Sequence, residues 1–193
     1  MNSDERKDRI LQALAEMLEQ PHTIRITADM LAEKLHISES SVYRCFSSKS
    51  KMYEALIVFI EQTLFGLINK IMQEEVAGGK QVESLLLLLL GFSQKNPGMT
   101  RILVGDVLIN ENAHLRFRIN QLHDRLEATL KQALRFAVSE RQLQSDWSIS
   151  AQANLLMCFV IGRWYQFVAS EFKREPLANW EALRLTLLPR ELL

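Results

Sequence analysis

Hydrophobic residues recur at helical spacing along almost the whole chain, and no segment shows the strict alternation that marks a half-buried strand. Breaks in the pattern fall at Gln20-Pro21, Ala77-Gly78-Gly79 and Asn96-Pro97-Gly98, where proline or glycine ends a helix. The pattern therefore predicts an all-α fold of about nine helices. The expected helices cover about residues 10–20, 27–35, 38–46, 48–75, 81–95, 99–109, 115–138, 145–173 and 178–188.

The character of the helices changes near residue 50. Those before it are short and polar on one face, whereas those after it are long and apolar on more than one side. This shift predicts two domains, a small N-terminal helical domain over residues 1–48 and a larger helical domain over residues 49–193.

The two short helices at residues 27–46 have the spacing of a helix-turn-helix. Thr27 and Ser38 stand where N-caps are expected, and the turn between the helices needs only Leu35, His36 and Ile37. In such a motif the second helix can enter the major groove of DNA. The apolar residues spaced to form its small core are Leu31, Leu35, Ile37, Val42 and Phe46.

The second short helix and the residues after it are rich in groups that bind phosphate. No acidic residue occurs from Ser40 to Tyr53, whereas Arg44, Lys49 and Lys51 and several hydroxyl groups do. Cations and hydroxyls are the usual partners of phosphate oxygens, and Lys49 stands where the long helix begins, itself an anion site. The whole chain has 23 basic and 23 acidic residues, so a polyanion needs such a local patch. A solvated polar helix face is the alternative interpretation.

Composition excludes several classes of protein. Apolar residues make up 48% and charged residues 24% of the 193 residues, as in globular proteins. The leucine-rich run at residues 85–92 is far shorter than the roughly 20 residues of a membrane span, and no secretory signal is expected. Two cysteines form no disulfide framework, the four histidines do not have metal-ligand spacing, and no glycine-rich phosphate loop follows a strand. We therefore expect a cytoplasmic protein that is not an enzyme and holds no metal or cofactor.

The sequence of residues 41–49, Ser-Val-Tyr-Arg-Cys-Phe-Ser-Ser-Lys, resembles the recognition-helix motif of the TetR family. The resemblance implies a dimer that binds DNA through an N-terminal three-helix domain. Cys45 replaces the histidine usual in that motif, and His36 stands where the turn usually has glycine, so we expect a left-handed backbone there. The residues expected to contact DNA are Thr27, Ser38, Ser40, Ser41, Tyr43, Arg44 and Lys49.

Residues 87–105, 118–122 and 167–173 further resemble the nucleoid occlusion branch of that family. This implies a protein that binds palindromic double-stranded DNA sites on the nucleoid, engages the C-terminal tail of FtsZ and inhibits division-ring assembly. The tail is expected along a groove beside the fourth and fifth helices, although Leu67 stands where relatives tend to carry arginine. Lys70 or Lys95 would then supply the charge, and an ordinary core role is the alternative for the apolar positions. The expected tail-binding residues are Phe59, Leu67, Leu88, Gly91, Lys95 and Asn96.

The eighth predicted helix is apolar on nearly all sides, which indicates burial on all sides. One side is expected to face a second subunit of a homodimer, with the last helix completing the interface. The alternative function is a ligand-responsive repressor that encloses an apolar compound in this helical body. The residues expected at the dimer interface are Phe159, Gly162, Trp164, Phe167, Trp180 and Leu187.

Overall fold

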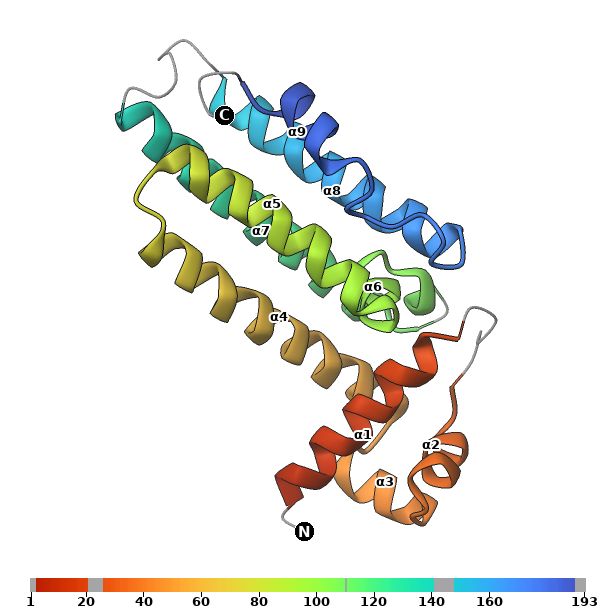
Figure 1. The fold of residues 1–193 in the computed structure, drawn as a ribbon. Helices are drawn as coiled ribbons and strands as arrows, with labels where there is room; N and C mark the ends of the chain where they lie inside the picture. Colours follow the sequence, from red (N-terminus) through yellow and green to blue (C-terminus); the bar gives the residue numbers. More distant parts are fainter. Residues whose placement is uncertain (1–2, 21–25, 110, 141–147, 190–193) are drawn as a thin grey trace. The chain divides into compact units, whose positions relative to one another are not determined.

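The computed structural model describes residues 3–20, 26–109, 111–140 and 148–189 (Figure 1). Within these residues the chain forms nine α-helices and one 3-10 helix and no strand, which confirms the predicted all-α fold. The helices are α1 (Ser3–Leu18), α2 (Ala28–Leu35), α3 (Glu39–Cys45), α4 (Lys49–Glu74), α5 (Gly78–Lys95), α6 (Pro97–Leu103), η1 (Asp106–Leu108), α7 (Ala113–Ser139), α8 (Ile149–Ala169) and α9 (Trp180–Leu187).

The clearest differences from the predicted helix bounds have local reasons. Gly78 and Gly79, predicted to lie in a break, are the first two residues of α5, and α8 ends at Ala169 rather than near residue 173, before the positive φ values of Glu171 and Phe172. The single helix expected over residues 99–109 is split into α6 and η1, because Gly105 takes a left-handed backbone with φ of 74°. The start expected for α8 at residues 145–147 lies outside the described residues. The described helix begins after Ser148, whose hydroxyl accepts a hydrogen bond from the backbone N–H of Ala151 at 3.4 Å.

The chain divides into two compact units. The first comprises residues 1–61 and 96–119, and the second comprises residues 62–95 and 120–193. Helices α4 and α7 contribute to both units. The division predicted at residue 48 concerns where a DNA-binding domain ends, and it stays a prediction.

Close packing of α6 on α1 holds the first unit together. A Cβ added at Gly98 of α6 would lie 2.0 Å from the backbone oxygen of Ala15 in α1. No side chain other than hydrogen fits this approach, so glycine is required here by the contact between the helices.

Arg101 of α6 fixes the end of α1. The residue is 7% exposed, and its guanidinium group pairs with Asp106 at 2.7 Å and donates to the carbonyl oxygens of Leu18 and Gln20, each at 3.3 Å. A buried arginine needs such partners, and the last carbonyls of a helix need donors. The arginine therefore satisfies both requirements at once.

In the second unit α5 lies beside α8. The indole Nε1 of Trp164, a fully buried side chain, donates to the carbonyl oxygen of Leu89 at 3.1 Å. At the start of α5, a Cβ on Gly78 would lie 2.3 Å from the backbone nitrogen of Ala137 in α7. These contacts bury the leucine-rich face of α5, as its spacing predicts.

Helix α8 is buried on most sides but keeps one exposed side in the single subunit, and the expectation that this side faces a second subunit stays a prediction. Its exposed residues include Leu155, Cys158, Gly162 and Tyr165, which follow one another at helical spacing and form a stripe along one side. We name these four residues the α8 stripe.

The six residues expected at the dimer interface divide into two groups. Trp164, Phe167 and Trp180 are 0%, 2% and 8% exposed within the subunit, so they belong to its own core. Phe159 and Leu187 are half-buried, and Gly162 is exposed. Only this second group presents accessible surface on the single subunit.

Within the described residues one helix, α4, has the length and mean hydropathy that a membrane span needs. Core helices of soluble proteins pass the same test, so this is weak evidence for a membrane protein.

Candidate nucleic-acid interface

Helices α2 and α3 are joined by a tight turn (Figure 1). The Thr27 hydroxyl caps α2 by accepting from the backbone N–H of Met30 at 3.3 Å. His36 ends α2 in the left-handed region with φ of 53°, as expected, and the N–H of Ile37 donates to the Ala32 carbonyl at 3.0 Å. The caps read from the sequence thus set the helix-turn-helix geometry.

The hydroxyl groups at the start of α3 form one cluster with an arginine. Ser38 Oγ lies 2.9 Å from Ser40 Oγ and 2.8 Å from Ser41 Oγ, and Arg44 Nη2 donates to Ser41 Oγ at 3.2 Å. Ser38 occupies the N-cap position but makes no capping hydrogen bond, because its hydroxyl contacts the other two serines instead. We name Ser38, Ser40, Ser41 and Arg44 the α3 cluster, and all four are exposed or half-buried.

The two tyrosines near α3 have different environments. Tyr43 on α3 is 48% exposed, whereas Tyr53 on α4 is only 2% exposed. Burial, together with the negative charge of Glu111, raises the pKa of Tyr53 to about 12. Tyr53 is therefore a core residue, which corrects its place among the expected phosphate-binding groups.

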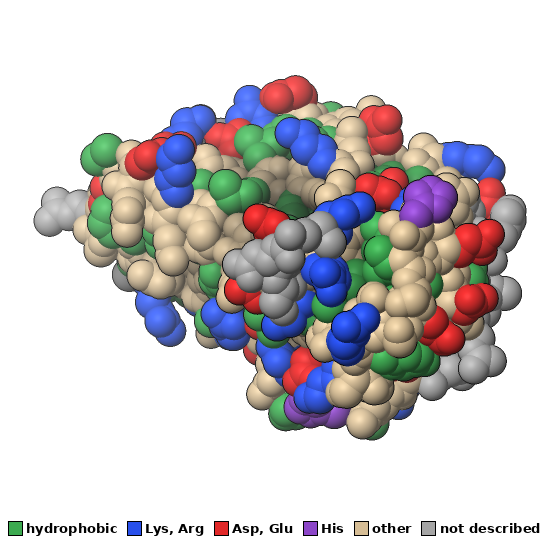
Figure 2. All heavy atoms as spheres, turned by 90° about the horizontal axis from the view of Figure 1, so that it is seen from below, with side chains coloured by type: hydrophobic (Ala, Val, Ile, Leu, Met, Phe, Trp, Pro, Cys, Tyr) green, Lys and Arg blue, Asp and Glu red, His purple; other side chains and the backbone are tan. Residues whose placement is uncertain are grey.

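Lys49 is the first residue of α4, as expected, but it already has an acidic partner. Its Nζ lies 2.6 Å from Glu111 Oε1 and 5.4 Å from the ring centroid of Tyr53. The stretch that is free of acid in the sequence is therefore not free of acid in space. On the molecular face shown in Figure 2, basic side chains are likewise interspersed with acidic ones.

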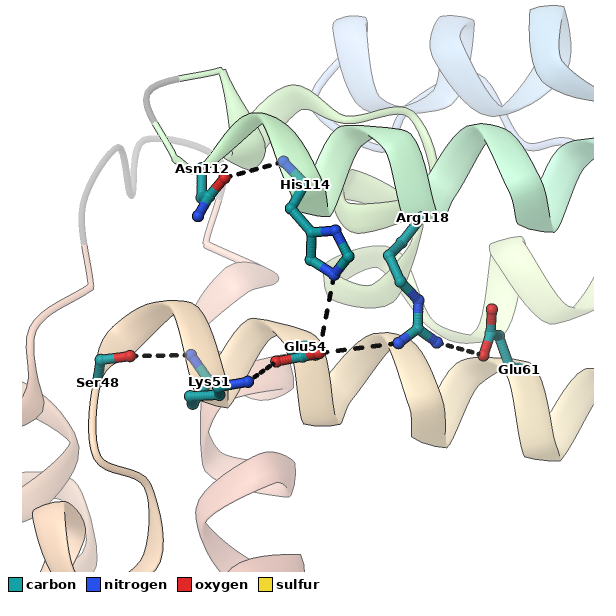
Figure 3. A network of polar contacts seen from close by, with 7 residues as sticks. All are labelled: Ser48, Lys51, Glu54, Glu61, Asn112, His114 and Arg118. Carbon is teal, nitrogen blue, oxygen red and sulfur yellow. Dashed lines mark hydrogen bonds and ion pairs between the residues drawn. The ribbon is translucent and has the colours of Figure 1, made fainter.

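A second polar network joins the first turns of α4 to the start of α7 (Figure 3). Glu54 accepts from Lys51 Nζ at 2.6 Å and lies 3.9 Å from both Arg118 Nη1 and His114 Nε2. Arg118 Nη2 also donates to Glu61 at 2.8 Å. The hydrogen bond from Lys51 is the main reason that the pKa of Glu54 is lowered. Lys51 and Glu54 are three residues apart on one helix, so the sequence could have revealed their pairing. No local pattern predicts that Arg118 joins them, because it lies far away in the chain.

The residues expected to bind a tail peptide lie in both units. Phe59 and Leu67 are each 43% exposed on α4, so Phe59 is not the core residue that the alternative interpretation required. Leu88 and Gly91 are half-buried on α5, and Lys95 is exposed at its end. Asn96, also half-buried, follows directly as the N-cap residue of α6.

A cleft of about 410 Å³ lies in the first unit between α1, α4 and the start of α6. It includes two of the expected tail-binding residues, Phe59 and Asn96. We name it the α1–α4 cleft; its lining residues are Asp8, Leu11, Gln12, Ala15, Glu16, Glu19, Leu56, Phe59, Asn96 and Met99. Over the described part of the chain, no group of three or more histidine, cysteine or acidic side chains could hold a metal ion.

The arrangement of the helices is that of the TetR-type transcriptional regulators. A TetR regulator from Haloarcula marismortui superposes with a TM-score of 0.79 at 18% identity, covering 95% of each chain. FadR from Bacillus subtilis, solved in complex with stearoyl-CoA, gives a TM-score of 0.75 at 12% identity, covering 93% of this chain and 96% of that chain. At these identities the likeness shows the fold.

Sequence similarity identifies the family more narrowly. The family model of SlmA-like tetracyclin repressor-like C-terminal domains matches residues 79–192. The nucleoid occlusion factor SlmA of Alteromonas mediterranea is 49% identical over 175 residues, which are 89% of this chain and 88% of that protein. The SlmA of Marinomonas sp. is 44% identical over 177 residues, 92% and 90% of the two chains. The chain belongs to the SlmA family of TetR-like proteins.

Proposed function

We propose that this protein is a nucleoid occlusion factor of the cytoplasm that acts on the nucleoid. As a homodimer it binds palindromic DNA sites through α2 and α3, and in that state it binds the C-terminal tail of FtsZ and inhibits division-ring assembly. The observation that carries this proposal is the α3 cluster, which gathers three hydroxyls and a guanidinium on the second helix of a helix-turn-helix. The relatives' name, nucleoid occlusion factor SlmA, supports the same function.

The DNA-binding role rests on the chemistry of the α3 cluster and its neighbours. Arg44 can read a base edge or bind a phosphate, Tyr43 and the serines can donate to phosphate oxygens, and Thr27 begins the motif. A two-fold dimer would place two copies of α3 roughly 34 Å apart, one turn of DNA.

Mobility-shift titration on a palindromic site tests this role. Arg44→Ala should abolish site-specific binding, and Thr27→Ala should weaken it. Arg135→Ala on α7, which removes an equal charge from the second unit, is the control and should bind like the wild type. Unchanged affinity in both Arg44→Ala and Thr27→Ala would exclude the proposed DNA face.

The dimer is proposed to form on the α8 stripe together with Phe159 and Leu187. Leu155 and Tyr165 are 53% and 64% exposed, and apolar surface of this size on one helix side favours a helix partner. The exposed Gly162 lies between them and allows two helices to approach closely. Tyr165→Asp should give monomers in analytical ultracentrifugation, whereas Tyr43→Asp, outside the stripe, should leave the dimer intact.

The FtsZ-binding role rests on exposed apolar side chains on α4 and on a cation at the end of α5. Phe59 and Leu67 offer apolar surface, and Lys95 offers charge for acidic residues of a peptide. Lys95→Asp should weaken binding of a labelled FtsZ tail peptide in fluorescence anisotropy without changing DNA affinity. Lys173→Asp, at another exposed site after α8, is the control, and equal peptide affinity in both variants would exclude Lys95.

A further inference from the structure

The α3 cluster is a chain of side-chain hydrogen bonds that ends at an arginine. Arg44 Nη2 donates to Ser41 Oγ at 3.2 Å, Ser41 Oγ lies 2.8 Å from Ser38 Oγ, and Ser38 Oγ lies 2.9 Å from Ser40 Oγ. Ser40 and Ser41 are four and three residues before Arg44, so the three residues share one side of α3. Because Ser41 accepts from Arg44, its own O–H remains available for Ser38. The half-buried Ser41 hydroxyl therefore has a partner on each side.

The conformation of Ser38 is an independent sign that this chain has a task of its own. Ser38 occupies the N-cap position of α3 with an extended backbone, yet it makes no capping hydrogen bond. The hydroxyls of Thr27, Ser48 and Ser148 each accept from a backbone N–H three residues further on, at 3.3, 3.2 and 3.4 Å. A missing N-cap costs a helix about 1 kcal/mol, and α3 has only seven residues. Departures from such local rules are expected where a side chain serves function.

The contacts with α3 direct the guanidinium group of Arg44. The residue stands in the last turn of α3, and its side chain runs back along the helix, with Nε 3.5 Å from the Ser40 carbonyl oxygen. This brings the guanidinium toward the first turn, the part of a recognition helix that contacts base edges. Arg44 is exposed, and neither contact uses Nη1 or the second N–H of Nη2. Two parallel N–H donors of this kind match O6 and N7 of guanine.

We propose that Ser41, oriented by Ser38, is a positioning residue that holds the Arg44 guanidinium along α3 so that its outer edge reads a guanine of the palindromic site. The inference rests on the proposed DNA binding and deepens it, because it gives Ser41 a task through Arg44 and not at a phosphate. An unsupported arginine side chain loses much rotamer freedom when it binds a base. Fixing the side chain beforehand lowers that cost, so Ser41 contributes to discrimination between base pairs more than to binding of DNA in general.

Anisotropy titrations on single-base variants of the DNA site test the proposal. A site is first selected from random duplexes with the wild-type protein, and each base pair is then replaced symmetrically in both half-sites. Arg44→Lys keeps the charge but not the bidentate donor edge, so it should lose discrimination at one G·C pair. Ser41→Ala should lower discrimination at this same pair roughly three- to tenfold, the range expected for a lost hydrogen bond. Ser40→Ala, the same change one residue earlier, leaves both Arg44 contacts in place and should keep it.

Two further variants separate positioning from a structural role. Ser41→Thr retains a hydroxyl and should restore discrimination, and Ser41→Ala combined with Arg44→Lys should discriminate no worse than Arg44→Lys alone. An equal loss of affinity for every DNA variant, with a lower melting temperature, would mean that Ser41 only supports the helix. Additive effects in the double variant would mean that Ser41 contacts DNA itself, and either result overturns the proposal. If the wild-type protein selects no site, the proposed DNA binding itself fails.

Discussion

The ion pair between Lys49 and Glu111 should oppose DNA binding. Lys49 Nζ lies 2.6 Å from Glu111 Oε1, so the lysine must leave this carboxylate before it can bind a phosphate. The negative charge of Glu111 would also repel any phosphate that approaches Lys49. Glu111→Gln keeps the shape of the side chain but removes its charge, and it should therefore raise DNA affinity.

The size of the effect follows from the exposure of the pair. The Lys49 and Glu111 side chains are 30% and 17% exposed, which places the pair near the upper end of the 0.2–1 kcal/mol typical of surface ion pairs. A gain of about 1 kcal/mol is a factor of roughly five per subunit, or about 25 for a dimer that uses both lysines.

Mobility-shift titrations at several salt concentrations measure this gain. Glu111→Gln should bind a palindromic site more tightly, while Glu181→Gln, an exposed charge on α9, should bind like the wild type. Lys49→Gln should make the slope of log affinity against log salt concentration less steep by about 1.8, because the dimer would lose two phosphate contacts. Equal or weaker binding by a folded Glu111→Gln variant would refute the competition between Glu111 and DNA.

Three further predictions concern stability. Gly98→Ala should lower the free energy of unfolding in urea by about 1–3 kcal/mol, because its Cβ would collide with the backbone of α1. Gly66→Ala on α4, where a Cβ would meet nothing within 4 Å, should raise that free energy by about 0.5–1 kcal/mol, and equal effects of the two changes would exclude the close approach. Trp164→Phe should lower the free energy of unfolding by about 1–3 kcal/mol, because it removes the indole N–H donor and leaves a cavity in the core; a neutral result in urea unfolding would contradict this burial. The pKa of Tyr53 in the folded protein is raised to about 12, so the unfolded chain loses this proton first and stability should fall from about pH 10 to pH 12. Tyr53→Phe should remove that part of the fall. An identical pH profile for the variant and the wild type would contradict the burial of Tyr53.

Local signals in the sequence predicted the helix-turn-helix well. Thr27 caps α2, His36 takes the left-handed turn and Lys49 begins α4, because capping and turn chemistry depend on neighbouring residues. The pairing of Lys49 with Glu111 could not be predicted in this way. The two residues lie far apart in the chain, and only the packing of the first unit brings them together.

Hydrophobic periodicity predicted the helices but not which apolar residues are covered. On α8 the apolar residues occur on every side, and the structure buries Trp164 while it leaves Leu155 and Tyr165 exposed. A core and a subunit interface both require apolar side chains at helical spacing, so the sequence cannot separate them. Phe59 shows the converse, since its spacing fits a core although 43% of it is exposed.

Sedimentation of FtsZ polymers tests the central claim most directly. Purified FtsZ is assembled with GTP, and the pelleted fraction is measured with this protein alone, with the protein and palindromic DNA, and with the Arg44→Ala variant and the same DNA. The proposed function predicts a marked loss of pelleted FtsZ only when the wild-type protein and the DNA are both present. Equal pelleting in all three mixtures, or an equal loss with Arg44→Ala, would contradict it.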